Sequence, residues 1–573
     1  MPIRNTDIAD IFNRMANLLE IDGANPFRVR AYRNAARTAA GLGRELADMV
    51  AGQEDLSRLP GIGKDLAGKI EEIVHTGALR QLQALEARVP PGLNDLLRVP
   101  GLGPRRVQAL YRNLGVSNLA QLEAAVRQNR IREVDGFGKK TEQSIRESLA
   151  RIENSRERFP LPEAEQRAAD LVAHLRAGRG IRRITVAGSY RRRQETVGDL
   201  DVLVVCGRDA DVMDRLARYG EVDKIVSRGS TRSSVVLKCG LQVDLRVVPA
   251  SAYGAGLHYF TGSKAHVVAL RRMGVARGLK INEYGVYRGN RRVAGKTEAE
   301  VYAQLDLPCI PPELRENEGE IEAAQAHCLP TLVELDDIRG DLHSHTRWSD
   351  GHDDLEAMAK AARDRGYAYL AVTDHSRRVA MANGLDAKRL AAQIEGIDRL
   401  NENLGSFRLL KAIEVDILED GTLDLPDAIL KDLDLRVCAI HYGLDLPRER
   451  QTRRILKAME NPYFNILAHP TGRLIGQRPG SDIDMERIMA AARQAGCILE
   501  LNADPRRLDL TDAHCRMAKE RGVKVAISTD AHSTDGLGLM RFGIGQARRG
   551  WLEAQDVVNT RGRDALLKSM RRS

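Results

Sequence analysis

Residues 186–205 read Val-Ala-Gly-Ser-Tyr-Arg-Arg-Arg-Gln-Glu-Thr-Val-Gly-Asp-Leu-Asp-Val-Leu-Val-Val and decide the fold of the middle of the chain. The residues just before this stretch predict a short buried strand, and the apolar, β-branched run that begins at Asp199 predicts another. Side chains two residues apart in a strand share a face, so Asp199 and Asp201 point the same way. Two carboxylates this close repel unless a cation lies between them, and Mg²⁺ prefers oxygen ligands of this kind.

A third acid, Asp244, occupies the polar position of the apolar run Leu-Gln-Val-Asp-Leu-Arg-Val-Val. Three acids on neighbouring strands make a two-metal site for in-line phosphoryl transfer. The turn at Gly188 and Ser189 fits this interpretation, because glycine lets backbone N–H groups approach phosphate oxygens. An Asp-x-Asp pair alone is more typical of a surface strand, but its combination with the glycine turn, residues 191–193 (all Arg) and Asp244 favours the phosphoryl-transfer site.

The length and composition of the chain limit the number of domains and the kinds of partner that it can have. A chain of 573 residues predicts three or four domains. A net charge of +9 suits a polyanionic partner such as nucleic acid, although a mildly basic enzyme can carry the same charge. The seven cysteines form no Cys-x-x-Cys pair, no signal peptide opens the chain, and no apolar run approaches the ~20 residues of a membrane span. The sequence predicts a reduced, cytoplasmic protein without a membrane partner.

The first 155 residues predict helices separated by glycine turns. One pattern recurs as Leu-Pro-Gly-Ile-Gly-Lys at 59–64, Val-Pro-Gly-Leu-Gly-Pro at 99–104 and Val-Asp-Gly-Phe-Gly-Lys at 134–139. In a helix-hairpin-helix, such glycines allow a tight turn, and the amides of the next helix bind a DNA phosphate without reading sequence. A single copy also fits an ordinary turn between helices, but three copies favour DNA binding. The predicted DNA-binding glycines are Gly61, Gly63, Gly101, Gly103, Gly136 and Gly138.

Residues 1 to about 315 resemble the family X DNA polymerases. The motifs Gly-Ser-Tyr-Arg-Arg, Gly-Asp-Leu-Asp-Val-Leu-Val, Val-Asp-Leu-Arg and Tyr-Phe-Thr-Gly-Ser carry the resemblance in this order. The resemblance implies that Asp199, Asp201 and Asp244 are catalytic and bind two Mg²⁺ or Mn²⁺ ions. It further implies that Ser189 and Arg192 hold the triphosphate beside Gly188, that Tyr259 and Phe260 lie against the nucleotide sugar beside Gly262, and that Arg271 approaches the template strand.

The chain departs from this family at a few positions. Val267 stands where related enzymes commonly place an asparagine that binds the incoming base, and Gln242 replaces an arginine that helps to orient the third carboxylate in the vertebrate repair polymerase beta. By resemblance, Lys69 is at the position of the lysine that forms a Schiff base with 5′-deoxyribose phosphate. Asp65, one helical turn away, should raise the pKa of Lys69 and repel that phosphate, so lyase activity is expected to be weak at most.

Eight of the thirteen histidines lie beyond residue 338, most of them in short frames that follow strand-like runs. Strands alternating with helices predict a (β/α) barrel, whose active sites lie at the carboxyl ends of the strands. A lone histidine there is more often structural, but His-x-His and Asp-x-His place paired ligands on one strand face. With Asp350 and Glu414, these nitrogen and oxygen ligands suit Mn²⁺, Zn²⁺ or Fe.

This part resembles the polymerase and histidinol phosphatase (PHP) domain over nearly its whole length. Some polymerase-linked domains of this kind have lost ligands and serve only as scaffold, whereas every ligand position here holds a competent residue. Clustered metals would activate a hydroxide and neutralise charge on an attacked phosphodiester. Arg473 is interpreted as a surface arginine, with phosphate binding as the alternative. The resemblance implies up to three metals bound by His343, His345, Asp350, His375, Glu414, His441, His469, Asp530 and His532.

The predicted fold is therefore multidomain. It combines an all-α helix-hairpin-helix N-terminal domain, an α/β nucleotidyltransferase palm with a small α+β thumb-like subdomain, and a C-terminal distorted (β/α) barrel of PHP type. The expected divisions are the DNA-binding domain at 1–155, the palm at 156–250, the nucleotide-binding subdomain at 251–315, a linker at 316–338 and the PHP domain at 339–573.

The predicted function is a bacterial DNA-directed DNA polymerase that fills short gaps in DNA repair. Its PHP domain is expected to supply a Mn²⁺-dependent 3′–5′ exonuclease, with AP endonuclease activity as a further option. The expected partners are gapped or primed DNA and dNTPs, and the chain is expected to be a monomer. Two alternatives stay open: a polymerase with a silent PHP scaffold, and a small-molecule phosphatase fused to a nucleotidyltransferase.

Overall fold

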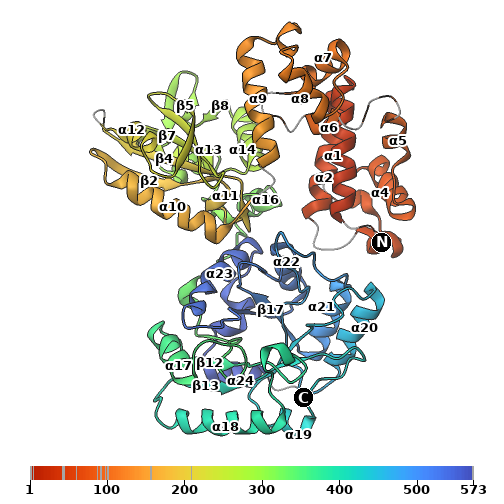
Figure 1. Ribbon diagram of the computed structural model, residues 1–573, viewed down its shortest axis with the longest axis vertical. Coiled ribbons are helices and arrows are strands. Elements are labelled where there is room, and N and C mark those ends of the chain that lie inside the picture. The colour runs from red at the N-terminus through yellow and green to blue at the C-terminus, as the bar shows by residue number, and fades with distance from the viewer. Residues whose placement is uncertain are drawn as a thin grey trace. The chain divides into compact units, whose positions relative to one another are not determined.

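The computed structural model describes residues 3, 5–41, 46–59, 61–86, 88, 90, 93–96, 99, 102–154, 158–207 and 210–570. These ranges exclude Gly101, one of the predicted DNA-binding glycines. The chain divides into two compact units, Met1–Arg158 and Phe159–Ser573 (Figure 1). Within the part of the chain that the structure describes, no helix combines the length and the apolar character needed to span a membrane.

The first unit consists of helices around one apolar core. In α1 (Asn5–Ile21), Ile8, Phe12 and Met15 are buried at helical spacing and pack with residues of α2 (Pro26–Gly41). The other helices of this unit are α3 (Leu46–Ala51), α4 (Lys64–Thr76), α5 (Arg80–Glu86), α6 (Leu93–Leu96), α7 (Pro104–Leu114), α8 (Leu119–Arg127) and α9 (Lys139–Asn154).

The second unit opens with a five-stranded mixed sheet in the order β2-β4-β7-β6-β5. Alternate residues of β4 (Asp199–Cys206) face opposite sides of this sheet. Leu200 and Val202 pack in the core with α10 (Leu161–Arg176), whereas Leu203 packs on the other side with α13 (Tyr253–Thr261). The remaining elements are β1 (Phe159–Pro160), β2 (Ile181–Val186), α11 (Gly188–Arg191), β3 (Thr196–Val197), α12 (Val212–Ala217), β5 (Val222–Arg228), β6 (Arg232–Leu237) and β7 (Gln242–Val247).

A small α+β subdomain follows. Its antiparallel sheet has the order β10-β9-β8, and Gly254 of α13 lets the chain pack closely, since a Cβ there would lie 2.0 Å from the backbone of Thr297. Residues 316–338, predicted as a linker, contain a short helix. The elements are α14 (Lys264–Ala276), β8 (Leu279–Asn282), β9 (Gly285–Arg288), β10 (Arg291–Ala294), α15 (Glu298–Ala303) and α16 (Glu320–Gln325).

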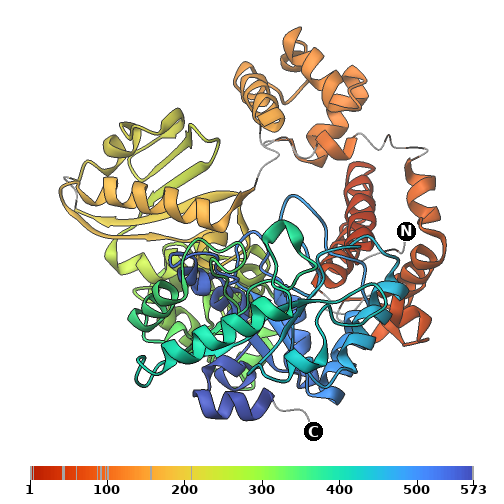
Figure 2. The ribbon, with the colours of Figure 1, turned by 60° about the horizontal axis from the view of Figure 1, so that its bottom comes forward.

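The C-terminal region, green to blue in Figure 2, is built on parallel strands. Its two sheets have the orders β11-β12-β13 and β14-β15-β16-β17-β18, and every pairing is parallel. Parallel bridges between Ser344 and Ala531 and between His375 and Glu414 join the two sheets. The arrangement confirms the predicted parallel α/β fold, with the distortion of a barrel made from two sheets.

Strand and helix bounds in this region follow the predicted alternation. The strands are β11 (Gly340–Asp341), β12 (Tyr369–Val372), β13 (Arg408–Lys411), β14 (Glu414–Asp416), β15 (Val437–Ala439), β16 (Ile466–Leu467), β17 (Ile498–Asn502) and β18 (Val525–Ser528). The helices are α17 (Leu355–Asp364), α18 (Ala387–Asn401), α19 (Asp427–Leu430), α20 (Arg448–Met459), α21 (Met485–Ala495), α22 (Asp512–Arg521), α23 (Met540–Arg549) and α24 (Arg563–Met570).

Candidate functional sites

The three predicted palm carboxylates lie on two adjacent strands. Asp199 and Asp201 alternate with buried residues of β4 and so share a face, and Asp201 is paired directly with Asp244 of β7. Burial raises the pKa of Asp201, and the charges of Asp199 and Asp244 raise it further, to about 7. An anionic group crowded in this way favours a cation as its partner.

Nearby residues shape this carboxylate site. Gly188 has φ 64°, and a Cβ there would lie only 2.6 Å from Asp201 Oδ2, so glycine is required beside the acid. Gln242 Nε2 donates to Asp244 Oδ2 at 2.8 Å, and the Ser234 hydroxyl donates to the other oxygen of Asp244. Gln242, which by resemblance replaces an arginine of the vertebrate repair polymerase beta, therefore contacts the third carboxylate.

The predicted triphosphate residues lie next to this site. Ser189 lies in the short helix α11, which begins shortly after β2, and Arg192 is the residue that follows this helix. Arg192 Nη1 donates to the carbonyl of Thr261 at 2.5 Å, and Arg192 Nε donates to Glu316 Oε1 at 2.9 Å. A Cβ on Gly262 would lie 3.1 Å from Arg192 Nη1, so the predicted phosphate and sugar residues are brought together.

The predicted sugar-binding aromatics end helix α13. The rings of Tyr259 and Phe260 meet edge to face with centroids 5.1 Å apart, and Arg246 lies over the Phe260 ring. Arg271 is exposed on α14, whereas Val267, on the same helix, is buried.

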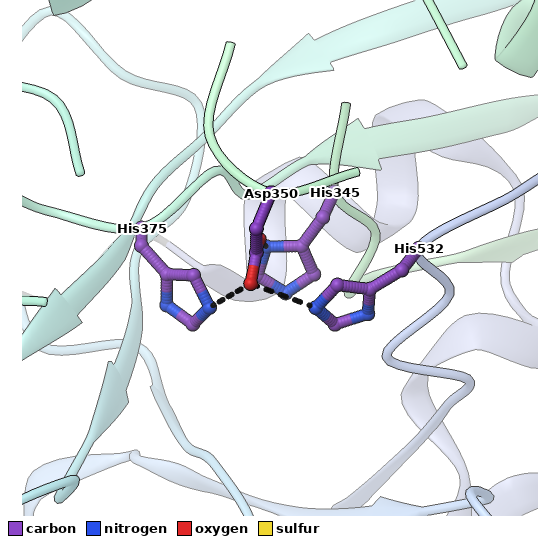
Figure 3. Close-up of side chains that lie close together, drawn as sticks. All are labelled: His345, Asp350, His375 and His532. Carbon is purple, nitrogen blue, oxygen red and sulfur yellow. Dashed lines mark ion pairs between the residues drawn. The ribbon is translucent and has the colours of Figure 1, made fainter. Parts of the chain in front are cut away.

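The nine predicted ligands of the C-terminal domain converge on one site. Three groups of side chains each place their ligand atoms within 4.8 Å of one another. Figure 3 shows one of them, in which Asp350 forms ion pairs with His375 and His532 beside His345. Among the described residues, the palm carboxylates form no such tight group. The three groups are His345, Asp350, His375 and His532; His343, His345 and Asp530; and His375, Glu414 and His441.

The remaining predicted ligand, His469, joins the cluster through Glu414, because its Nε2 lies 3.0 Å from Glu414 Oε1. His469 and Asp530 both have positive φ, 27° and 54°, although neither is glycine. Backbone held in such a sparsely populated region costs of order 1–3 kcal/mol per residue and is typical of ligand-binding sites.

The hydrogen bonds and charges of the C-terminal cluster indicate whether its side chains suit metal ions. Both ring nitrogens of His345 and Nε2 of His343 are buried without a hydrogen-bond partner. Burial lowers the pKa of His375, but the carboxylates of Glu414 and Asp350 outweigh it and raise that pKa to about 10. The opposing charges also hold the pKa of Glu414 well below its usual range despite burial. Imidazole nitrogens that make no hydrogen bond and lie close to buried carboxylates suit divalent cations.

Sequence reasoning missed the residues that orient these ligands. His343 Nδ1 lies 2.7 Å from Glu500 Oε1, and His441 Nδ1 lies 3.0 Å from Asp416 Oδ1, so each ring turns Nε2 toward the cluster. Such outer partners fix the tautomer of a metal-binding histidine. Asp416 and Glu500 are acidic residues within the otherwise apolar, buried strands β14 and β17, and this pattern in the sequence could have identified them.

A pocket of about 440 Å³ opens onto the cluster. It is lined by seven of the nine predicted ligands and by Val379, Met381, Ala382, Tyr442, Arg506 and Arg507. Arg506 is paired with Asp504. The interpretation of Arg473 as a surface arginine is wrong: its side chain is only 16% exposed, and Nη1 donates to Glu195 Oε2 at 3.2 Å, because the palm packs against this part of the domain.

The described residues of the three glycine turns in the first unit share one hydrogen bond. The N–H of the buried residue between the glycines donates to the carbonyl three residues earlier, at 3.0–3.1 Å in each copy. The second glycine directly precedes α4, α7 or α9 and has no atom within 4 Å of its Cβ position. The open N-terminal amides suit a phosphate ligand. The described glycines of these turns are Gly61, Gly63, Gly103, Gly136 and Gly138.

Lys69 lies on α4 and forms the ion pair with Asp65 that their spacing predicts. Its Nζ also lies over the Tyr32 ring, 5.3 Å from the centroid. Burial lowers the pKa of Lys69, but hydrogen bonds with Asp65 and Tyr32 outweigh it and leave the pKa above its ordinary value. This lysine is protonated at neutral pH and is therefore a poor nucleophile.

Several parts of the chain match known domain families. Residues 3–79 match the helix-hairpin-helix domain, and residues 93–151 match the SAM-like helix-hairpin-helix tandem. Residues 256–316 match the DNA polymerase beta thumb, and residues 341–502 match the PHP domain.

Similar curated proteins cover the chain to different extents. The DNA polymerase/3′–5′ exonuclease PolX of Bacillus subtilis (strain 168) is 39% identical over 97% of each chain. A probable phosphatase of Thermoanaerobacter sp. (strain X514) is 31% identical over 38% of this chain and 89% of its own length, and one of Acetivibrio thermocellus is 29% identical over 34% of this chain and 78% of its own. The chain belongs to the family X DNA polymerases that carry helix-hairpin-helix domains, a polymerase beta thumb and a C-terminal PHP domain.

Proposed function

We propose that this chain fills short gaps in DNA with its palm and trims 3′ ends with its PHP domain. The observation that carries the proposal is the coexistence, in one chain similar to PolX over 97% of its length, of the palm acids and a complete set of nine PHP ligands. We assign the domains as 1–155, 156–250, 251–315 and 339–573, with a linker at 316–338.

In the palm, Asp199, Asp201 and Asp244 would hold two Mg²⁺ or Mn²⁺ ions. Such ions, when bound, stabilise both the attacking and the leaving oxygen of an in-line displacement. Arg192 and the backbone amides at Gly188 and Ser189 would bind the triphosphate. The pairing of Asp201 with Asp244 supports this assignment, because it holds two of the acids side by side on adjacent strands of the sheet.

The subdomain would place the nucleotide sugar and the template. Tyr259 and Phe260, next to the turn at Gly262, would crowd a ribose 2′-hydroxyl, so that dNTPs are preferred over rNTPs. The position of this turn beside Arg192 supports the assignment, because sugar and triphosphate must be bound together. Exposed Arg271 would contact the template strand.

In the PHP domain, the nine ligands would hold up to three ions of Mn²⁺, Zn²⁺ or Fe. These ions, when bound, supply a nucleophilic hydroxide and neutralise phosphate charge. Glu500 and Asp416 orient two of the histidines, and Arg507 in the pocket offers a cation to the DNA phosphate. The same site would accept an abasic-site phosphodiester, which is the basis of the proposed AP endonuclease activity.

The proposed substrates are gapped or primed DNA and dNTPs, with the DNA backbone bound by the glycine turns. We propose a monomer that acts on bacterial DNA in the cytoplasm. For Lys69 we propose weak lyase activity at most, since its ion pair with Asp65 keeps the amine protonated.

One experiment tests both activities. Purified protein receives a labelled one-nucleotide-gapped duplex with Mn²⁺, with or without dNTPs. Extension with dNTPs and stepwise shortening from the 3′ end without them are expected. Absence of shortening would favour a silent PHP scaffold, whereas absence of extension would contradict the polymerase assignment.

The similarity of the C-terminal region to probable phosphatases favours a second candidate, hydrolysis of phosphate monoesters. Comparing a 3′-phosphorylated primer with a 3′-hydroxyl primer separates the two. Release of inorganic phosphate without release of nucleotides would identify a phosphatase.

A further inference from the structure

The predicted triphosphate arginine is held by the PHP domain. Arg549, at the end of α23, donates from Nη1 to the backbone carbonyl of Arg192 at 3.0 Å and to Glu316 Oε1 at 3.0 Å. Glu316 Oε1 in turn accepts the Arg192 Nε–H at 2.9 Å. One guanidinium of the nuclease domain therefore contacts both the main chain of Arg192 and the carboxylate that holds its side chain.

The contacts are largely shielded from solvent. The side chains of Arg192, Glu316 and Arg549 are 13%, 17% and 6% exposed. Nη2 of Arg549 donates to Asp512 Oδ2 at 2.7 Å, which fixes the far side of the guanidinium. Charged hydrogen bonds between residues with this little freedom restrict orientation more strongly than exposed pairs do.

The remaining surroundings keep Glu316 ionised and in place. Burial raises its pKa, but the guanidinium groups of Arg192 and Arg549 outweigh this and hold the pKa below the ordinary value. Gln194 Nε2 also donates to Glu316 Oε1, at 2.6 Å. One turn before Arg549, a Cβ on Gly545 would lie 3.4 Å from Arg193 Cβ, so α23 packs closely on the palm.

Arg192 is anchored on its other side by the Thr261 carbonyl, next to the turn proposed to bind the sugar. Its Nε and Nη1 are thus both directed by other residues, and the orientation of the guanidinium plane is set before a nucleotide arrives. Preorganising a phosphate-binding arginine lowers the cost of binding, because less side-chain freedom is lost.

We infer that Arg549 of the PHP domain, acting through Glu316, is a positioning residue for the nucleotide-binding arginine Arg192. The inference rests on the proposed polymerase function. It means that the PHP domain contributes to dNTP affinity through a residue that is not part of its metal cluster.

The test compares variants in single-nucleotide gap filling. Arg549→Gln should raise the KM for dNTP roughly tenfold, as expected for the loss of charged hydrogen bonds, with a smaller change in kcat. Pyrophosphate, which probes the triphosphate site alone, should inhibit this variant less strongly. Arg549→Lys should restore only part of the affinity, because an ammonium lacks the fork that reaches Glu316 and Asp512 together.

The matched control is Arg541→Gln on the same helix. Arg541 also binds the palm, through Glu165 at 2.9 Å, but is 46% exposed and does not contact Arg192. Its variant should keep the wild-type KM. Both variants should shorten a 3′ end in Mn²⁺ at the wild-type rate, which shows that the PHP domain is folded.

Arg192→Ala separates failure of the inference from failure of the function. If Arg192→Ala raises the KM and Arg549→Gln does not, the positioning role is wrong and the polymerase assignment stands. If neither variant raises the KM for dNTP, Arg192 does not bind the triphosphate, and both that assignment and the positioning role of Arg549 are wrong. Equal loss of both activities in Arg549→Gln would make Arg549 a folding residue and would also overturn the inference.

Discussion

Asp201 of β4 and Asp244 of β7 are directly paired across two parallel strands, next to a glycine that leaves no room for a Cβ. Asp201→Asn should therefore remove a metal-binding charge and abolish gap filling, while 3′ shortening continues, because the hydrolytic ligands lie in another domain. Primer extension and Mn²⁺-dependent shortening measure the two activities. Asp223→Asn, at an exposed position of the same sheet, is the control. If the folded Asp201→Asn variant still extends a primer, the assignment of the polymerase site to these carboxylates is wrong.

The same substitution should stabilise the metal-free protein. The raised pKa of Asp201 means that the folded chain binds this proton more tightly than the unfolded chain does. Stability is consequently lost as the pH rises from about 4 to about 7, and Asp201→Asn avoids this loss. In chelator at pH 8 the variant should gain roughly 1–3 kcal/mol in the free energy of unfolding, and little at pH 4. Denaturant titration at both pH values checks this; a gain of equal size at pH 4 would point to another cause.

Replacing His343 and His345 by Ala should stop Mn²⁺-dependent degradation while gap filling continues. The two residues belong to overlapping ligand groups, so at least one metal position loses two donors. Elemental analysis should find fewer bound metals per chain, and primer assays should separate the activities. His352→Ala, an exposed histidine of the same domain, is the control. Shortening at the wild-type rate by the double variant would place the nuclease elsewhere.

Glu500→Gln tests orientation of a ligand without removing one. Glu500 Oε1 accepts from His343 Nδ1, and Oε2 accepts the backbone N–H of His469 at 2.8 Å. Loss of the charge should weaken metal binding or nuclease activity by roughly 10–100-fold. Titration with Mn²⁺ measures the loss, which higher Mn²⁺ should partly reverse. Glu520→Gln, on the surface, should behave as wild type; an unchanged Mn²⁺ requirement in Glu500→Gln would exclude the orienting role.

Asp65→Asn should make Lys69 more reactive. The carboxylate raises the pKa of Lys69, and without it only Tyr32 opposes the effect of burial, so that the pKa falls and more neutral amine is present at pH 7–8. Borohydride trapping on a 5′-deoxyribose phosphate substrate should yield a weak adduct in wild type, a stronger one in Asp65→Asn and none in Lys69→Ala. An adduct that survives Lys69→Ala would assign the nucleophile to another residue, with Lys264 the next candidate.

The sequence by itself determined the chemistry of the individual segments. Strand alternation put Asp199 and Asp201 on one face, and short motifs such as Asp-Leu-His-Ser-His identified ligands at strand ends, because side-chain direction within one element follows from residue spacing. The repeated glycine turns could be predicted from the sequence for the same reason, because the hydrogen bond that they share joins residues only three positions apart.

Only the tertiary structure decided how distant segments complete each site. Glu500 orients His343 across 157 residues, Arg473 is buried against Glu195 across 278, and Arg549 reaches Arg192 across 357. No periodicity relates residues that far apart, because their distance depends on how whole sheets and helices pack. Arginine and glutamate are also common on surfaces, so burial alone distinguished these partners from solvated charges.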